Sequence, residues 1–289
     1  MKPFSIEILP AQIGAGSSCL HNIVKHSRCQ ACALVCPSGA VTLNDGKVNF
    51  DTENCISCGA CLFACPTGGV DKIVPPLRHY RDNTLVMPLS NMAPSVGELL
   101  MWHAEYHIRA VEFELALNPG WGMAIATLNI RLKQLKQPLW RIVPPPATAV
   151  DKTRRHWLQI DNNSKTGRAT QGGRMRRALF QAVSEYQILL DENQCFLCGA
   201  CARICPESAI ELNRESITLK HRSCTGCGCC EAICLSNAIK LEENYECSTT
   251  ELAVTEVSCS SCHRLFLAWN EQSGQCPICS RHHYGMREA

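Results

Sequence analysis

The spacing of the cysteines constrains this chain more than any other feature. A run of the form Cys-x2-Cys-x2-Cys-x3-Cys begins at Cys55, at Cys195 and at Cys224. A fourth run, which ends at Cys36, has all but its first cysteine. The step from Cys36 to Cys55 equals the step from Cys205 to Cys224, so the chain carries one repeated unit, once early and once late.

Runs of this form hold cubane [4Fe–4S] clusters, and the fourth cysteine of each run binds the cluster of the other run. On these motifs both copies resemble the bacterial two-cluster ferredoxins, at about residues 15–78 and 186–245. The resemblance implies two ferredoxin-like domains with two clusters each. Between the two runs of each copy, alternating apolar residues at 40–50 and at 209–219 predict a β-hairpin. The crossing predicts four ligand sets, namely Cys36 with Cys55, Cys58 and Cys61; Cys29, Cys32 and Cys65 with one further ligand; Cys195, Cys198 and Cys201 with Cys234; and Cys205 with Cys224, Cys227 and Cys230.

The register of the first run places His26 where a cysteine is expected. Three explanations compete for the missing ligand. Cys19 can return as a remote fourth thiolate, and we prefer it because thiolate is the commoner ligand. His26 can bind iron itself, which raises the reduction potential as imidazole ligation does in Rieske centres. The third explanation is a three-iron cluster, with both residues structural.

The number of cysteines, 22 in 289 residues, indicates either disulfides in a secreted protein or metal ligation in a reducing compartment. Two cysteines three residues apart suit one metal centre, which favours metal. No basic stretch followed by an apolar one opens the chain, and no apolar run approaches the length of a membrane span. We therefore expect a cytoplasmic protein without a membrane span. The net charge of +2 argues against a nucleic-acid binder.

Residues 79–146 contain no cysteine and are predicted to form a small α/β module. Strands are predicted at 84–89, 110–115 and 139–143, and helices at 95–107, capped by Ser95, and at 121–137. This alternation implies a small parallel sheet. The module resembles one that follows ferredoxin motifs in some multi-cluster proteins, where cysteines often lie near the ends of the first two strands. Here those places hold Leu89 and the turn 118–122, which favours a structural or docking role. His103 and His107 are expected to be solvated.

Residues 147–185 are predicted to form a basic linker that leads into a helix from about residue 174 to residue 186. Between Asp151 and Arg177 there are eight Lys and Arg residues and two Asp residues. A basic face can steer an acidic redox partner toward the protein. A solvated linker with charges that maintain solubility is an equally good interpretation. Nucleic-acid binding is the weakest one, because aromatic residues are scarce in the segment.

Residues 246–289 carry two Cys-x2-Cys pairs, namely Cys259 with Cys262 and Cys276 with Cys279. Two such knuckles bring four thiolates around one ion, so the segment is predicted to be a zinc ribbon that a structural Zn²⁺ holds together. A strand is expected at residues 265–269, between the knuckles. Rubredoxin-like iron is the alternative, because the same four thiolates bind iron.

The predicted fold class is α+β, with two ferredoxin-like domains, a central α/β module and a zinc ribbon. Only Cys229 and Cys247 are left without a metal. Cubanes with four thiolate ligands have no open iron position, so they move single electrons rather than transform a substrate. We expect an electron carrier, not an enzyme, between a redox donor and a larger oxidoreductase such as formate dehydrogenase. The alternative is an accessory protein that docks and matures an iron–sulfur or molybdenum enzyme.

Overall fold

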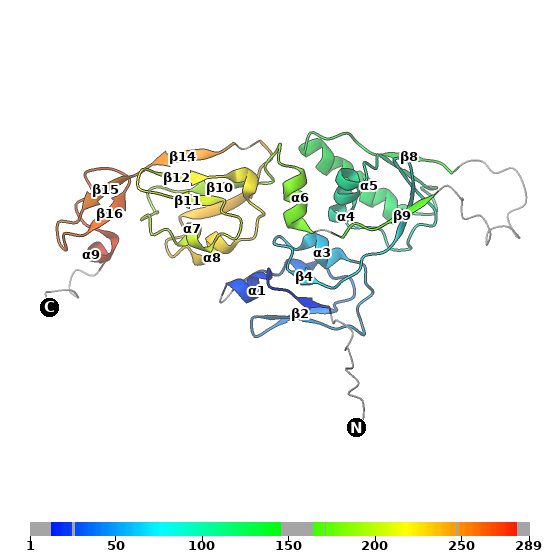
Figure 1. Cartoon of the computed structure of the whole chain (residues 1–289), viewed down its shortest axis with the longest axis horizontal. Helices are drawn as coiled ribbons and strands as arrows, with labels where there is room; N and C mark the ends of the chain where they lie inside the picture. Colours follow the sequence, from blue (N-terminus) through cyan, green and yellow to red (C-terminus); the bar gives the residue numbers. More distant parts are fainter. Residues whose placement is uncertain (1–12, 25–26, 146–163, 171, 247, 282–289) are drawn as a thin grey trace, which may run out of the picture. The chain divides into compact units, whose positions relative to one another are not determined.

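The computed structural model of the chain describes residues 13–24, 27–145, 164–170, 172–246 and 248–281 (Figure 1). The chain folds into two compact units. The first contains the described residues up to 24 and those from 30 to 179, and the second contains residues 27–29 and those from 180 onward. None of the helices in the described ranges is both long and apolar enough to cross a membrane.

The first unit begins with the elements that carry the early cysteine runs. They are β1 (Gly14–Ala15), α1 (Leu20–Ile23), α2 (Ala31–Leu34), β2 (Val41–Asn44), β3 (Lys47–Phe50), α3 (Ala60–Ala64) and β4 (Val70–Asp71). β2 and β3 form the predicted hairpin, and Asp45 and Gly46 between them both have positive φ, as a two-residue turn of this kind requires. β1 pairs with β4 and so joins the two ends of this cysteine-rich part.

A five-stranded sheet follows, in the order β8–β7–β6–β5–β9. Its strands are β5 (Arg78–Arg81), β6 (Thr84–Val86), β7 (Ala110–Glu112), β8 (Arg141–Val143) and β9 (Lys165–Gly167). β6, β7 and β8 are parallel, which confirms the predicted arrangement. β5 and β9 add two antiparallel strands that the sequence did not indicate. β6 ends at Val86 rather than at residue 89, because Pro88 has no N–H to donate to a ladder.

Two helices, α4 (Val96–Glu105) and α5 (Pro119–Gln134), belong to the same module. Ser95 is the N-cap of α4 as predicted, and its hydroxyl accepts a hydrogen bond from the backbone N–H of Glu98. α5 begins at Pro119, earlier than the predicted residue 121, because proline suits the first position of a helix. Side chains of both helices and the sheet form the core, among them Leu85, Leu99, Trp102, Val111, Trp121 and Leu128.

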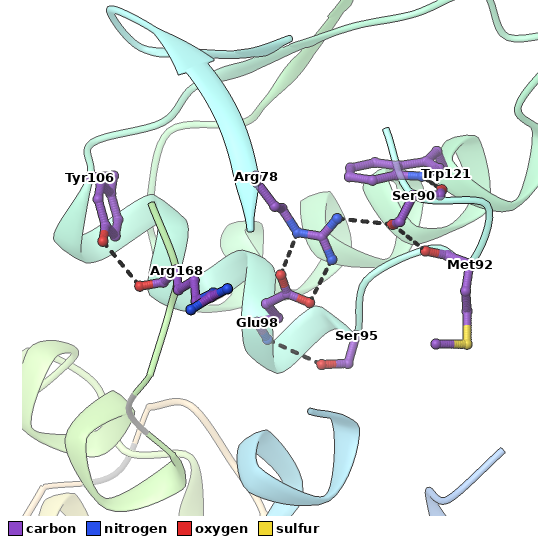
Figure 2. Close-up of polar contacts among 8 residues, drawn as sticks. All are labelled: Arg78, Ser90, Met92, Ser95, Glu98, Tyr106, Trp121 and Arg168. Atoms are coloured by element: carbon purple, nitrogen blue, oxygen red, sulfur yellow. Dashed lines mark hydrogen bonds and ion pairs between the residues drawn. The ribbon is translucent and has the colours of Figure 1, made fainter. Parts of the chain in front are cut away.

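A buried ion pair fastens β5 to α4. The side chains of Arg78 and Glu98 are 5% and 1% exposed, and the guanidinium donates two hydrogen bonds to the carboxylate, one of them at 2.8 Å. Arg78 also donates to Ser90 Oγ at 3.0 Å and lies 5.0 Å from the centre of the Trp121 ring (Figure 2). The Trp121 indole N–H donates to the Ser90 carbonyl oxygen at 2.9 Å. Each nitrogen of the Arg78 guanidinium therefore has a hydrogen-bond partner, and these contacts hold β5, α4 and α5 together.

His103 corrects the expectation that the two histidines of this region are solvated. It is 1% exposed, and its Nδ1 accepts a hydrogen bond from the Trp140 indole N–H at 3.0 Å. Burial lowers the pKa of His103 to about 4, so the ring stays neutral near pH 7. The expectation was wrong because His103 lies on the buried face of α4, next to Trp140. His107 lies past the end of α4 and is exposed, as expected.

Residues 147–163 of the predicted linker lie outside the described residues, and its later part contributes α6 (Gly173–Leu179) to the first unit. The Gly173 N–H donates to the Cys65 carbonyl oxygen at 3.2 Å, so the start of α6 lies against the early cysteine-rich part. Just before it, the Arg168 carbonyl oxygen accepts from the Tyr106 hydroxyl at 3.0 Å (Figure 2). The sequence predicts a helix to residue 186, but α6 ends at Leu179 and Tyr186 begins a strand. Residues 186–190 pair with the distant strand at residues 239–243, and this pairing prevails over the helical pattern of the local sequence.

The second unit contains the complete cysteine repeat. Its elements are β10 (Tyr186–Leu190), α7 (Ala200–Ile204), β11 (Ile210–Leu212), β12 (Ser216–Leu219), the 3₁₀ turn η1 (His221–Ser223), α8 (Cys229–Ile233) and β13 (Ile239–Glu243). β11 and β12 form the predicted hairpin, and β10 pairs along its whole length with β13. The core is formed by apolar side chains of these strands, among them Ile188, Ile210, Ile217, Leu219 and Ile239.

The last part of the chain is attached to this repeat. β14 (Thr250–Ala253) pairs with β12 and so adds a third strand to the β11–β12 hairpin. β15 (Thr255–Ser258) and β16 (Leu265–Ala268) form a second hairpin, in which β16 is the strand predicted there, and α9 (Pro277–Arg281) follows. Leu267 and Trp269 pack against the core of the cysteine repeat. The tail is therefore packed against the repeat rather than merely tethered to it.

Replacement of Glu98 by Ala leaves the buried Arg78 charge without its main partner. We expect the free energy of unfolding of the first unit to fall by about 3–5 kcal/mol. Glu211→Ala in the second unit breaks an exposed ion pair with Lys220. It should change the free energy of unfolding of that unit by less than about 1 kcal/mol. Urea unfolding followed by circular dichroism measures both variants, and equal losses would contradict the argument.

Candidate metal centres

Each complete cysteine run bends through the same backbone turn. Gly59, Gly199 and Gly228 follow the second cysteine of their runs, and their φ values are 75°, 68° and 74°. Glycine adopts this left-handed conformation without a steric penalty. The turn starts a short helix, α3, α7 or α8, which carries the third cysteine, and the fourth cysteine ends that helix as its C-cap. One local geometry therefore presents the thiols of all three runs.

Two pockets of the second unit are each lined by four cysteines. The first pocket is lined by Cys195, Cys198, Cys201 and Cys234, together with apolar side chains of β10 and β13. The second is lined by Cys205, Cys224, Cys227 and Cys230, again with apolar side chains of the same two strands. In both pockets three thiols come from one run and the fourth from the other. The structure thus brings together the two crossed sets that the spacing predicts for this repeat.

The electrostatics of the thiols follow the same grouping. Burial, together with the neighbouring Cys195 and Cys198, raises the pKa of Cys201 to about 11. Burial also raises the pKa of Cys230, whose charged neighbours are the other three thiols of its pocket, Cys224, Cys227 and Cys205. Buried thiolates so close together repel one another. A positively charged metal core removes this penalty, because a thiol bound to a metal is deprotonated outright.

A hydrogen-bonded turn surrounds the last cysteine of every run. The backbone N–H four residues on donates to the sulfur, at 3.1 Å from Gly69 to Cys65, 3.2 Å from Ala209 to Cys205 and 3.3 Å from Ala238 to Cys234. Ala40 donates in the same way to Cys36. The residue before each donor has positive φ, namely Gly39, Gly68, Ser208 and Asn237. These backbone donors suit a thiolate sulfur, and cysteine spacing alone does not reveal them.

A buried hydroxyl also fits a cluster in the second pocket. Thr225 Oγ1 is buried and has no hydrogen-bond partner in the part of the chain that the structure describes. Thr225 lines the pocket together with Cys224 and Cys227. A buried hydroxyl normally finds a partner, and the sulfur atoms of an iron–sulfur core can accept its hydrogen bond. The four thiols and the Thr225 hydroxyl of this pocket therefore fit a [4Fe–4S] core.

The early repeat gathers part of the predicted sets. Burial raises the pKa of Cys61 to about 12, and Cys58, Cys32 and Cys55 are its charged neighbours. Cys32, which the spacing assigns to the other cluster, thus lies within electrostatic range of the Cys55 run. For Cys36, burial raises the pKa, but hydrogen bonds from the Ser38 hydroxyl and from backbone N–H groups outweigh this and lower it overall.

Cys19 lies close to Cys65. A Cβ at Gly69 would come within 2.4 Å of the Cys19 backbone, and the Gly69 N–H donates to Cys65 Sγ. The Thr67 hydroxyl, next to Cys65, donates to the Ser18 carbonyl oxygen at 2.7 Å. The pairing of β1 with β4 produces this approach. The neighbourhood supports Cys19 as the remote fourth ligand, and His26, the competing residue, lies outside the described residues.

Two further cysteines stand apart from these groups. Cys29 belongs by its contacts to the second unit, whereas Cys32 and Cys65 belong to the first. Cys229 is buried at the start of α8 and does not line the pocket that contains Cys230. A hydrogen bond with Cys229 instead lowers the pKa of Cys227 to about 7. Cys247, the other spare cysteine, lies outside the described residues.

The tail holds a compact four-sulfur group. The Sγ atoms of Cys259, Cys262, Cys276 and Cys279 all lie within 4.8 Å of one another. Hydrogen bonds from the backbone N–H groups of Cys276 and Cys262 lower the pKa of Cys259 to about 6, whereas hydrogen bonds with Cys276 and Cys262 raise the pKa of Cys279 to about 12. This spacing suits a single ion, and the four thiols leave no open position for a substrate.

A tryptophan links the tail to the first pocket of the repeat. The Trp269 indole N–H donates to the Cys195 carbonyl oxygen at 2.6 Å. Trp269 follows β16, so the hairpin of the four-sulfur group is held against a pocket-lining cysteine. Sequence reasoning missed this contact, because nothing in the spacing of Trp269 relates it to Cys195.

Cys230 and Cys229 are adjacent and both buried, so they form a matched pair. We expect Cys230→Ala to lose about four of the irons bound by the anaerobically reconstituted chain, because one cubane loses a ligand. Cys229→Ala should keep all of them, since its thiol lies outside the pocket. Iron analysis measures both variants, and the reverse order would show that Cys229 is the ligand.

Cys262→Ser removes one thiol of the four-sulfur group. We expect the chain to lose one tightly bound metal ion and the β15–β16 hairpin to become sensitive to proteolysis, because small segments of this kind fold around their metal. The control is His263→Asn, since asparagine tolerates the left-handed conformation of this residue. Elemental analysis of both variants decides, and metal loss from the control as well would assign His263 to the site.

Residues 27–69 and 194–238 each match the family model of the 4Fe-4S dicluster domain. No curated protein matches the chain closely enough to count as a relative. The second matched stretch contains all eight cysteines that line the two pockets of the second unit. The chain is therefore an iron–sulfur, metal-binding protein of electron transport, with two repeated 4Fe-4S domains of ferredoxin type.

Proposed function

We propose that this protein carries four [4Fe–4S] clusters and relays single electrons between a redox donor and a larger oxidoreductase. The observation that supports it best is the pair of pockets in the second unit, each lined by four cysteines from two different runs. The ligand sets, with Cys19 completing the set of Cys29, Cys32 and Cys65, are those of the spacing argument. The cluster domains span residues 15–78 and 186–245.

A [4Fe–4S] cluster with four thiolate ligands supplies one-electron transfer and no open iron position. The protein holds the thiolates in place with the left-handed turns and stabilises their charge with the backbone donors after Cys36, Cys65, Cys205 and Cys234. Apolar side chains of β10 and β13 keep water from the two pockets of the second unit. Hydrogen bonds to sulfur, burial and net charge then set the reduction potentials.

The other parts of the chain have supporting roles in this proposal. The tail binds one structural Zn²⁺, with rubredoxin-like iron as the alternative metal. The α/β module is a structural or docking element, since its buried centre is filled by the Arg78–Glu98 pair and aromatic side chains. Reduced thiols in such number suit the cytoplasm. A molybdenum-dependent formate dehydrogenase is the first oxidoreductase to test as a partner.

Anaerobic purification and reconstitution test the proposal directly. We expect about sixteen irons per chain in the clusters and low-potential reducible signals in electron paramagnetic resonance spectra. The clusters should survive repeated cycles of reduction and reoxidation. A much lower iron content, or thiols tied up as disulfides, would contradict the proposal.

A cluster-transfer assay separates this role from that of a maturation protein. The loaded chain is mixed with an apo-form of an iron–sulfur enzyme, and iron is followed in both proteins after separation. An electron carrier keeps its iron, whereas a maturation protein passes it on. Transfer of most of the iron would favour the accessory role.

A further inference from the structure

The turn after the last cysteine of each run is repeated four times, which allows a comparison within one chain. In three of the four turns the residue two positions after the cysteine carries a hydroxyl near the sulfur. Ser38 Oγ is 3.7 Å from Cys36 Sγ, Thr67 Oγ1 is 3.8 Å from Cys65 Sγ, and Ser236 Oγ is 3.6 Å from Cys234 Sγ. After Cys205 the same position is Glu207.

The backbone of the Cys205 turn does not differ from the others. Ser208 has positive φ, like its three counterparts, and the Ala209 N–H donates to Cys205 Sγ at 3.2 Å. Only the side chain at position 207 is different. Glu207 lines the pocket formed by Cys205, Cys224, Cys227 and Cys230. A carboxylate thus occupies the place that a hydroxyl has in the other three turns.

The two side chains have opposite effects on a redox centre. Reduction adds one electron from the donor, and it forms and breaks no bond and moves no proton. The hydroxyls of Ser38 and Ser236 can donate to sulfur and so stabilise the added negative charge, whereas a nearby carboxylate repels it. The Thr67 hydroxyl donates to the Ser18 carbonyl oxygen and adds no negative charge to its turn. Water screens the repulsion by the carboxylate less than at the protein surface, because Glu207 is half-buried in the pocket lining. An acidic residue at this position therefore makes the cluster harder to reduce.

We propose that Glu207 is a tuning residue that lowers the reduction potential of the cluster bound by Cys205, Cys224, Cys227 and Cys230. The inference rests on the proposed four-cluster electron carrier. The second unit then holds two unequal clusters, and the first added electron resides on the one bound by Cys195, Cys198, Cys201 and Cys234. That cluster lies beside the tail, where Trp269 contacts Cys195.

The test is a potentiometric titration of the full reconstituted chain under anaerobic conditions, followed by electron paramagnetic resonance. Glu207→Gln removes the charge and keeps the shape, and Glu207→Ser restores the hydroxyl of the other turns. In both variants we expect one cluster to become easier to reduce. At a fixed potential its ratio of reduced to oxidised form should rise about tenfold, a shift of about 59 mV for one electron.

Two further variants sharpen the result. Ser236→Glu places the carboxylate in the turn after Cys234 and should shift a different cluster by a similar amount in the opposite direction. Glu211→Gln removes a negative charge from β11 in an exposed pair with Lys220 and should leave all potentials unchanged. A shift with Glu211→Gln as large as that with Glu207→Gln would show a general charge effect and overturn the proposal.

Iron content separates this inference from the proposed function. If the wild-type chain binds about sixteen irons and the Glu207 variants keep them with unshifted potentials, the role of Glu207 is wrong and the electron carrier stands. If the wild-type chain lacks reducible clusters, the proposed function fails first. Equal shifts of both clusters of the second unit would also contradict the inference, because Glu207 lines only one pocket.

Discussion

Thiol groups from two distant runs meet in one pocket, and the second unit depends on this convergence. Burial, and to a smaller extent repulsion between the thiols, raises the pKa values of Cys201 and Cys230, so the protein alone disfavours their ionised form. A metal core with positive charge reverses this preference. The β10–β13 ladder supplies the apolar side of both pockets and ties the two ends of the repeat together. Binding of a metal core to these thiols would therefore be coupled to folding of the unit.

The repeated turns show how a local conformation serves this purpose. Glycine in the left-handed region lets each complete run turn into a short helix, and a second left-handed residue directs a backbone N–H toward the sulfur of the last cysteine. The backbone conformation is the same at all four turns, so the turns differ in the side chains that they carry. Glu207 is the clearest such difference, since the other turns carry hydroxyl groups.

The α/β module, α6 and the tail contain none of the predicted cluster ligands, and specific contacts hold each of them in its unit. In the first unit the buried Arg78–Glu98 pair, with Ser90 and Trp121, fixes β5 in the α/β sheet, and α6 lies against the backbone of Cys65. In the second unit β14 and Trp269 attach the tail to the repeat. The four-sulfur group of the tail is thus held next to a pocket-lining cysteine rather than at the end of a free linker.

The sequence by itself determined the cysteine groups of the second unit, both hairpins, the Ser95 cap and the parallel strands, because each depends on spacing or on residues near one another in the chain. Features that depend on residues far away in the sequence were decided only by the tertiary structure. It added β5 and β9 to the sheet, ended α6 before Tyr186, buried His103 beneath Trp140 and placed Cys19 near Cys65. A local pattern cannot specify these, since strand pairing and burial are fixed by the surface that the remainder of the chain presents.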